Sequence, residues 1–576
     1  MPLQRQDNFE SIRRDGDFDV LIVGGGINGL GVFRELSLQG VRVLLVERCD
    51  FCSGCSAAPS RMIHGGLRYL ENGEFNLVRE SLAERDALLL NAPHMVRPLP
   101  TTIPLATRMS GLFNAATSFL GLSDKPAQRG ALPVKIGLAL YDLVTRKRRQ
   151  LPPHRFRSAR ETKEKWPELT SNLRYSATYY DAWISHPERL GIELISDTIE
   201  MAPQSIALNY VEVRRDADGY VLHDRESGAD LPINPRVIVN ASGAWLDNVR
   251  RNLTGGAPDD APLISGTKGS HLILDTPNLH DALDGHMMFF ENTDGRVCIV
   301  FPYLGKVLAG STDIRVETVT RTRCEDDERD YILGSLRLIF PDLNISENDI
   351  VFSYSGIRPL PSSDHNFTGR ISRSHFTHRL DGPVPQICMV GGKWTTFRAF
   401  AEQTADKVLT ELGHARTCDT HQLAIGGGKD FPEHVKTLIE GLSRDLGISS
   451  ERAAYLVDAY GTQAATVWRD CRARGQDTPV VAGCSLTCAE VVRMVTHEQA
   501  RHPADILLRR TNLAITGQVS TEMIATIANV MAQELGWTTE QTDAEIAAFT
   551  DELSRYHGVS ATTLNQRSLK RNTECA

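Results

Sequence analysis

The segment FDVLIVGGGINGLGVFRELSLQGVRVLLVE, residues 18–47, decides the fold of this chain. Residues 18–23 are apolar without alternation, which predicts a strand that is buried on both faces. A glycine-rich turn follows, and residues 30–39 then have a helical pattern. Residues 41–46 predict a second buried strand. The order strand, turn, helix, strand is typical of a βαβ unit in a parallel sheet.

Three glycines in this segment have the G-x-G-x-x-G spacing of a dinucleotide-binding turn. Gly24 permits the tight turn, Gly26 lets the backbone approach a pyrophosphate, and Gly29 lets the helix pack closely on the strand. The N-terminus of the helix presents unpaired N–H groups to the phosphates. Glu47 is placed to accept hydrogen bonds from an adenosine ribose. The pattern favours nucleotide binding over a plain βαβ unit, but it does not separate FAD from NAD.

Length and composition describe an ordinary soluble protein of several domains. The chain has 576 residues, which is too long for one core and predicts two to four domains. A formal net charge of −9 argues against general nucleic-acid binding. We find no run of about 18 uncharged apolar residues, so we expect no transmembrane helix. The first 17 residues lack the apolar region of a signal peptide and predict a short polar arm.

The cysteines favour a reducing compartment, the cytoplasm. There are 11, an odd number in a long chain that carries a cofactor motif. Cys49, Cys52 and Cys55 form a C-x-x-C-x-x-C run, which raises the alternative of an iron–sulfur cluster. The usual fourth cysteine and its following proline are missing from this run. We therefore expect free thiols and no metal site.

A second glycine-rich return distinguishes FAD from NAD. Residues 386–390 predict a late buried strand, which Gly391, Gly392 and Lys393 follow before another helix. An FAD protein needs such a late strand–Gly-Gly–helix unit at the flavin end of its extended cofactor, and a simple NAD domain does not. The polar segment RMIHGGLRYL, residues 61–70, also suggests close backbone approach to a ligand, although an ordinary turn explains it equally well.

The rest of the chain suggests further domains and one contact surface. Seven Lys and Arg residues and no acid lie between residues 143 and 160, next to an apolar helix, which fits attachment to anionic lipid. A solvated basic loop, or a site for an anionic partner, is the alternative. Residues 425–429 predict a flexible junction before a helical domain, and the tail from residue 566 predicts disorder. Gly356 and Pro359 predict a turn that holds Arg358.

Several motifs together resemble one family, the FAD-dependent glycerol-3-phosphate dehydrogenases of the aerobic, quinone-linked type, which are also related to glycerol-phosphate oxidases. The resemblance covers about residues 18–420 and, more loosely, the helical C-terminus. Its motifs are GGGINGLG, the run from SRMIHGGLRYLENGEF to LLLNAPH, KGSHLIL, GSTD, YSGIRPL and GGKWTTFR. In this order and spacing the combination is highly specific.

The resemblance implies a fold of class α/β plus α. An FAD domain with two dinucleotide-binding folds would be interleaved with an antiparallel-sheet substrate domain and followed by a C-terminal helical domain. The expected boundaries are 1–17 for the arm; 18–75, 185–260 and 350–415 for the FAD domain; 76–184 and 261–349 for the substrate-binding region; 425–560 for the helical domain; and 561–576 for the tail.

The resemblance also implies site residues. The substrate pocket would contain Arg68, Tyr69, His271, Arg358, Arg373 and Lys393. The cofactor would contact Gly24, Gly26, Asn28, Gly29, Glu47, Ser60, His64, Gly65, Gly66, Gly243, Gly391, Gly392 and Thr395. The implied reaction is oxidation of sn-glycerol 3-phosphate to dihydroxyacetone phosphate, with electrons passed to quinone. The expected location is the cytoplasm, and attachment to the inner face of the cytoplasmic membrane is left open. Homodimer formation is also left open.

The chemistry of these residues agrees with a phosphorylated alcohol. A phosphate dianion needs fixed cations, and the arginines offer bidentate geometry. Loss of the hydroxyl proton accompanies hydride transfer to the flavin. Either His271 or Lys393 could take that proton, and Arg358 would act beside them. A hydrogen-bonded sheet histidine and a solvated lysine are the structural alternatives, and the sequence does not choose the base.

Departures from the family leave other functions open. Cys55, Ala57, Ala58 and Pro59 replace the usual Thr, Ser and Arg; Ser185-His186-Pro187-Glu188 replaces an acidic pair; Ala244 replaces proline; and Ser374 follows Arg373 in place of an acid. Residues near 108–130 resemble an insertion. A related polyol phosphate, such as a tetritol phosphate, is therefore an alternative substrate. An amine or amino-acid oxidase, and a flavin-binding protein without turnover, are further alternatives.

Overall fold

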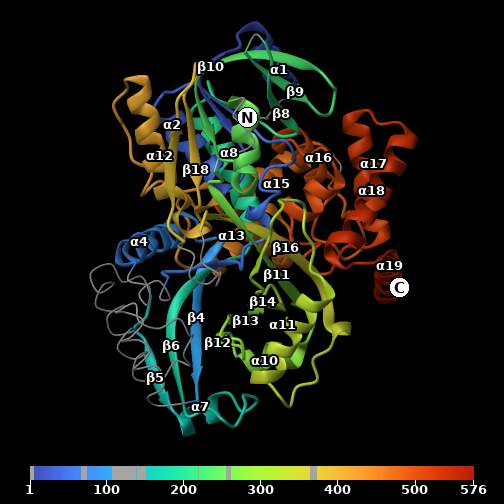
Figure 1. Ribbon diagram of the computed structural model, residues 1–576. Coiled ribbons are helices and arrows are strands. Elements are labelled where there is room, and N and C mark those ends of the chain that lie inside the picture. Colours follow the sequence, from blue (N-terminus) through green and yellow to red (C-terminus); the bar gives the residue numbers. More distant parts are fainter. Residues whose placement is uncertain are drawn as a thin grey trace.

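Two sheets and a group of C-terminal helices form the described part of the computed structural model (Figure 1). The structure describes residues 5–66, 74–106, 138, 151–217, 219–254, 261–363, 373–475 and 477–575. The first sheet, called sheet A, lies at the top of Figure 1, and the second, sheet B, lies below it. The C-terminal helices, orange to red, lie beside both.

Sheet A contains eight strands and carries the dinucleotide motif. Its order is β17 (Phe376–Leu380), β18 (Gln386–Val390), β10 (Asp230–Asn240), β1 (Asp17–Val23), β2 (Val43–Val46) and β7 (Ile206–Leu208), with β8 (Val211–Arg215) and β9 (Tyr220–Asp224) extending from β10. The five strands from β18 to β7 run parallel, and β17 is antiparallel to β18. Strand β10, far from β1 in the sequence, therefore lies beside it, and β18 lies beside β10.

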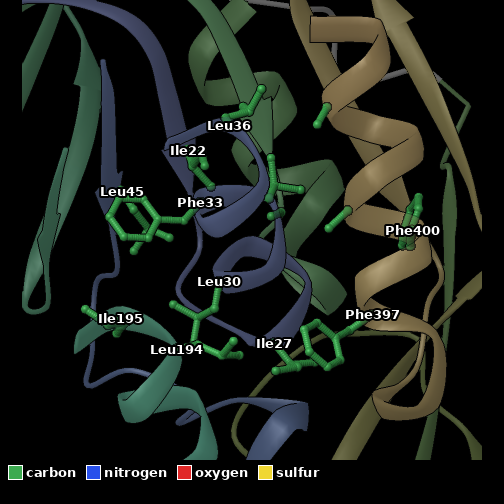
Figure 2. Packing of buried hydrophobic residues seen from close by; sticks show 14 of the residues in the cluster. Ile22, Ile27, Leu30, Phe33, Leu36, Leu45, Leu194, Ile195, Phe397 and Phe400 are labelled. Atoms are coloured by element: carbon green, nitrogen blue, oxygen red, sulfur yellow. The ribbon is translucent and has the colours of Figure 1, made fainter. Parts of the chain in front are cut away.

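Both faces of sheet A are buried, which explains the continuous apolar run in β1. Val20 and Ile22 face one core, whereas Leu21 and Val23 face another. The first core packs against α2 (Ile27–Leu38), α8 (Pro187–Met201) and α12 (Phe397–Leu412), as Figure 2 shows. Gly31 permits close packing of α2 on α12, because a Cβ there would lie 2.9 Å from the Cβ of Ala401.

Sheet B contains ten strands. Its order is β15 (Ile314–Arg315), β11 (Ile264–Leu274), β14 (Lys306–Gly310), β13 (Val297–Tyr303), β12 (Met287–Glu291), β4 (Val96–Leu105), β6 (Tyr175–Ile184) and β3 (Met62–Ile63); β16 (Ile350–Pro361) pairs with β11, and β5 (Arg155–Ser158) with β6. Its pairs are antiparallel except β12 with β4. Helices α10 (Pro277–Leu283) and α11 (Asp326–Ile339) cover one face.

The remaining helices lie at the edges and in the C-terminal part. They are α4 (Phe75–Asn91), α7 (Ala159–Lys165), α9 (Leu246–Thr254), α13 (Val435–Leu446), α14 (Ser450–Tyr460), α15 (Ala464–Ala473), α16 (Cys488–Glu498), α17 (Thr521–Leu535) and α18 (Thr539–His557). A π-helical turn spans Asp505–Arg510. Side chains of α16, α17 and α18 share a core with sheet B. The predicted fold class is confirmed.

The two predicted polar ends are helical. Helix α1 (Arg5–Arg14) occupies most of the expected arm, and Phe9 and Ile12 bury themselves against sheet A. Helix α19 (Ala561–Cys575) occupies the expected disordered tail, and Leu564 joins the core shared with sheet B. Phe9 and Ile12 in one segment, and Leu564 in the other, pack against a partner surface, which composition alone does not reveal.

The glycine-rich segment at residues 425–429 is a tight junction, contrary to the predicted flexibility. Gly426, Gly427 and Gly428 are all buried in a 3-10 turn. A Cβ on Gly427 would lie 2.1 Å from the carbonyl oxygen of Tyr460, and one on Gly428 would lie 2.2 Å from that of Asn91. Glycine is required here because three pieces of backbone meet, and the junction is therefore fixed.

Candidate active site

A cavity of about 1200 Å³ lies where the two sheets and the C-terminal helices meet. It exceeds the roughly 300–1,000 Å³ of ordinary small-ligand pockets, and so it can hold an extended cofactor together with a substrate. Predicted site residues on its wall are Gly24, Gly26, Asn28, Glu47, Ser60, His64, Gly243, Arg358, Arg373, Gly391, Gly392, Lys393 and Thr395. The structure thus brings together residues from four distant segments of the chain.

The turn between β1 and α2 forms a glycine cradle at one end of the cavity. Gly24 has a φ of +114°, and a Cβ there would lie 2.6 Å from the carbonyl oxygen of Ala241. A Cβ on Gly29 would lie 2.0 Å from the carbonyl oxygen of Gly24, although Gly29 itself is behind the wall. The N-cap residue of α2, Gly26, has no side chain. Gly26, Ile27 and Asn28 all line the cavity, so the first turn of this helix faces it. Such a helix N-terminus suits a pyrophosphate.

Two polar side chains complete the fit to a dinucleotide. The carboxylate of Glu47 accepts hydrogen bonds from the amides of Gly25 at 2.8 Å and Cys49 at 2.9 Å, which hold it in place. Burial raises the pKa of Glu47, and these two amides oppose the shift. Asn28 donates to the carbonyl oxygen of Gly391 at 3.2 Å, whereas its buried Oδ1 accepts no hydrogen bond from the described residues. An unsatisfied acceptor on a cavity wall points to a bound partner.

The glycine pair after β18 lies beside the turn between β1 and α2. Gly391 has a φ of +81° and Gly392 a φ of +96°. A Cβ on Gly392 would lie 2.5 Å from Nδ2 of Asn28, so the return after β18 touches the start of α2. Thr395 accepts a hydrogen bond at 3.2 Å from the amide of His64. The residues of this cavity therefore fit FAD, whose flavin end would lie near this return.

Two arginines converge on one carboxylate at that end. Arg358 donates to Oδ1 of Asp313 at 3.1 Å, and a guanidinium nitrogen of Arg373 lies 3.7 Å from Oδ2. Gly269 makes room for Arg358, because a Cβ there would lie 2.0 Å from its NH2. Arg358 lies within strand β16, so the predicted turn is wrong. Pairing with β11 continues through Pro359, opposite Gly266, which keeps the segment extended.

Lys393 lies on the same wall and has an unusual amine. Its Nζ donates to Oγ of Ser81 at 2.8 Å. Burial lowers the pKa of Lys393 to about 7, while Glu80 and Glu74 oppose that shift. Burial and the charge of Lys393 lower the pKa of His64 to about 3, so His64 is neutral at ordinary pH.

His271 is buried behind the cavity and does not line it. Its Nε2 lies 2.9 Å from Oγ of Ser60, which does line the cavity, and its ring stacks on Tyr354 with centroids 4.9 Å apart. Burial lowers the pKa of His271 well below its ordinary value. The imidazole is therefore neutral and contacts the cavity through Ser60. Its role as a catalytic residue stays a prediction.

Other predicted residues lie near the site or outside the described part of the chain. Gly65 donates its amide to Asp181 at 2.9 Å, and Gly66 has a φ of +76°; neither lines the cavity. Arg68 and Tyr69 lie outside the described residues, as do most of the basic residues between 143 and 160.

The C-terminal part of the chain supplies wall residues that sequence reasoning missed. His502, Arg509, Phe549 and Glu552 line the cavity, and Arg321, from the segment between β15 and α11, lies on the same wall. The sequence motifs do not mark these positions.

The cysteine run divides between two environments. Cys49 and Cys55 are half-buried and line the cavity, whereas Cys52 is buried against Gly191 of α8. Among the described residues, no group of three or more His, Cys, Asp or Glu side chains is arranged to hold a metal ion.

Comparison with known proteins agrees with this geometry. The family model for FAD dependent oxidoreductases matches residues 19–406, and the model for the C-terminal domain of alpha-glycerophosphate oxidase matches residues 418–542. A glycerol-3-phosphate dehydrogenase of Synechocystis sp. is 33% identical over 568 residues, which cover 94% of this chain and 97% of the relative. An aerobic glycerol-3-phosphate dehydrogenase of Staphylococcus saprophyticus is 27% identical, with 95% and 96% covered.

A solved structure has the same fold. The crystal structure of a glycerol-3-phosphate dehydrogenase from Bacillus halodurans, complexed with FAD, aligns with a TM-score of 0.72 and 23% identity, and the match covers 96% of this chain and 97% of that chain. The family model gives the cofactor, which is FAD, and the glycine cradle fits the pyrophosphate of such a dinucleotide. The chain belongs to the FAD-dependent glycerol-3-phosphate dehydrogenase family.

Proposed function

We propose that the protein oxidises sn-glycerol 3-phosphate to dihydroxyacetone phosphate and that the electrons pass from FAD to a quinone. One observation carries the substrate class: Arg358 and Arg373 converge on Asp313 at the cavity end where Lys393 also lies. Two guanidinium groups against one carboxylate suit a phosphate dianion, and each arginine can bind it through two parallel hydrogen bonds. The dehydrogenase relatives support the same substrate.

The chain's own residues bind the substrate and move its proton. Arg358 and Arg373 would hold the phosphate group and place the neighbouring secondary alcohol near the late glycine return. Lys393 is the better base, because its amine has a pKa of about 7 and lines the cavity. His271 would orient Ser60 and exclude water from the space behind it. When bound, FAD supplies the hydride acceptor.

A longer polyol phosphate is a second candidate. Cys55, Ala58 and Pro59, three of the departures from the family pattern, line the same cavity as Arg358. Small side chains there leave space beyond the phosphate-binding cations. A tetritol phosphate would use the same arginines and the same base.

Anaerobic flavin reduction tests these substrates. The holoenzyme would be mixed with sn-glycerol 3-phosphate, with four- and five-carbon polyol phosphates and with unphosphorylated glycerol, while the flavin absorbance is followed. We expect sn-glycerol 3-phosphate to bleach the flavin and glycerol to leave it oxidised. An oxidised flavin at saturating sn-glycerol 3-phosphate would refute the main proposal, and bleaching by a longer polyol phosphate alone would establish the second.

The acceptor and the membrane contact need separate tests. Among the described residues, no helix is long and apolar enough to cross a membrane. Of the seven basic residues between 143 and 160, Arg157 is buried, where its guanidinium lies 5.2 Å from the ring of Trp166, so it supports sheet B. We propose that the other basic residues bind anionic lipid. Sedimentation with anionic vesicles at low salt tests this binding, and reoxidation of the reduced flavin by a soluble quinone tests the acceptor.

A further inference from the structure

Helix α4 lies behind Lys393 and presents a fixed acceptor to its amine. The hydroxyl of Ser81 donates to the carbonyl oxygen of Leu77 at 2.6 Å, so its proton is already used along the helix. The remaining lone pairs can only accept, and Nζ of Lys393 donates to this oxygen at 2.8 Å. Ser81 is fully buried and does not line the cavity. Ser81 therefore contacts the amine of Lys393 from the side away from the cavity.

Glu80, the preceding residue, has a carboxylate of which only one oxygen accepts a hydrogen bond from the described residues. Its Oε2 accepts from Gln403 at 3.2 Å, whereas its buried Oε1 accepts no hydrogen bond from the described residues. That oxygen lies 3.6 Å from Nε2 of His375. Burial lowers the pKa of His375 to about 4, helped by Lys393, so the imidazole is neutral at ordinary pH. Burial raises the pKa of Glu80, and the charge of Lys393 is the main influence that opposes this shift, so the carboxylate and the amine favour each other's charged forms.

We propose that Ser81 and Glu80 are positioning residues for Lys393: Ser81 fixes the amine at the cavity wall through its hydrogen bond, and Glu80 adds a buried carboxylate from the adjoining position of α4. The proposal rests on the proposed function, because Lys393 matters to turnover only if it serves the oxidation. The geometry of α4 and the lysine is independent of the substrate.

Within the described part of the chain, five titratable or charged groups act on this amine, and they come from three segments. They are Glu74 and Glu80 from α4 and its start, His64 from the segment after β3, and Arg373 and His375 from the segment before β17. Burial and Arg373 lower the pKa of Lys393, and the two carboxylates oppose them. The two histidines stay neutral, so removal of the charge of Glu80 lowers that pKa further.

Labelling of the holoenzyme tests the proposal without any turnover. Acylation of Lys393 by acetic anhydride would be measured against pH by peptide mass spectrometry, since only the neutral amine reacts. We expect Glu80→Gln to move the labelling midpoint about one unit toward lower pH. Ser81→Ala should move it in the same direction, because the cation loses an acceptor, and Ser81→Thr, which keeps the hydroxyl, should restore it.

Arg79→Gln is the matched control, because it changes one charge on the exposed side of the same helix. Its midpoint should equal that of the unmodified protein. Flavin content reports folding, and if Glu80→Gln loses its flavin, Ser81→Ala and Glu80→Asp decide the question. An unchanged midpoint in a variant that retains flavin, either Glu80→Gln or Ser81→Ala, overturns the proposal.

Kinetics separate this proposal from the proposed function. With sn-glycerol 3-phosphate, Glu80→Gln should move the acid limb of the kcat profile to lower pH, because the base is neutral at lower pH. If labelling shifts while sn-glycerol 3-phosphate is not oxidised, the positioning role stands and the proposed function fails. If labelling shifts and turnover is unchanged at every pH, Lys393 is not the base.

Discussion

The buried ion pair between Arg61 and Glu188 gives the sharpest stability prediction. The guanidinium donates to the two carboxylate oxygens at 2.7 and 2.8 Å, and the two side chains are only 4% and 6% exposed. The guanidinium also lies 5.7 Å from the rings of Tyr303 and Tyr354. Arg61 follows Ser60 and has a φ of +55°, a conformation that needs support from its surroundings. The pair therefore fixes the backbone beside the cofactor cavity.

Removal of one partner should cost far more than removal of both. Glu188→Leu would leave a buried guanidinium without its counter-charge, which typically costs about 3–5 kcal/mol of unfolding free energy. The double variant Arg61→Met/Glu188→Leu buries no charge, and such replacements are often neutral or stabilising by about 1–4 kcal/mol. We therefore expect the double variant to be at least as stable as the unmodified protein.

Urea unfolding, followed by circular dichroism and by flavin release, measures these differences where the two transitions coincide. The matched control is Glu164→Leu, which removes an exposed Arg160–Glu164 pair with side chains 88% and 60% exposed. Its unfolding midpoint should not change. The reasoning would be refuted if Glu188→Leu moved the midpoint no more than Glu164→Leu, or if the double variant were as unstable as the single one.

Three further predictions concern the cradle, the junction and the C-terminal contact. Gly29→Ala places a Cβ 2.0 Å from the carbonyl oxygen of Gly24, so the purified protein should lose most of its flavin, measured as the ratio of flavin to protein absorbance. Gly427→Ala should lower the thermal midpoint because its Cβ meets backbone at 2.1 Å; an unchanged midpoint would contradict the tight junction. Burial would lower the pKa of His502, but hydrogen bonds to two carboxylates raise it to about 10. Its stabilisation should be complete below the ordinary value of 6.5 and disappear as the pH rises through 10, and His502→Gln should remove this part of the pH dependence of urea stability.

Local patterns predicted which residues of the first βα unit lie together on one cavity wall. Gly24 and Gly26 lie on the cavity wall, and Glu47 is held there by backbone amides, because strand, turn and helix interact within one short segment. The return at Gly391 and Gly392 also lies beside Asn28. Glycine positions such as these depend on local backbone conformation, and the spacing of glycines in the sequence indicates that conformation directly.

Long-range contacts explain what the sequence could not predict. A run of glycines signals either a flexible backbone or close packing of backbone against backbone. Only the carbonyl groups of Tyr460 and Asn91 show that Gly427 and Gly428 are closely packed. Likewise, histidine is a residue type that often serves as a catalytic base. Only the fold shows that Ser60 lies between His271 and the cavity. In both cases the deciding neighbour lies far away in the chain.

The cavity wall has a consequence for the biogenesis of the protein. Gly24 and Glu552 both line it, so its wall joins the first turn of sheet A to helix α18. While the chain is still on the ribosome, the segment with Gly24 can present the glycine cradle before the C-terminal side of the enclosure exists. The enclosed binding site can therefore form only after α18 has emerged from the ribosome.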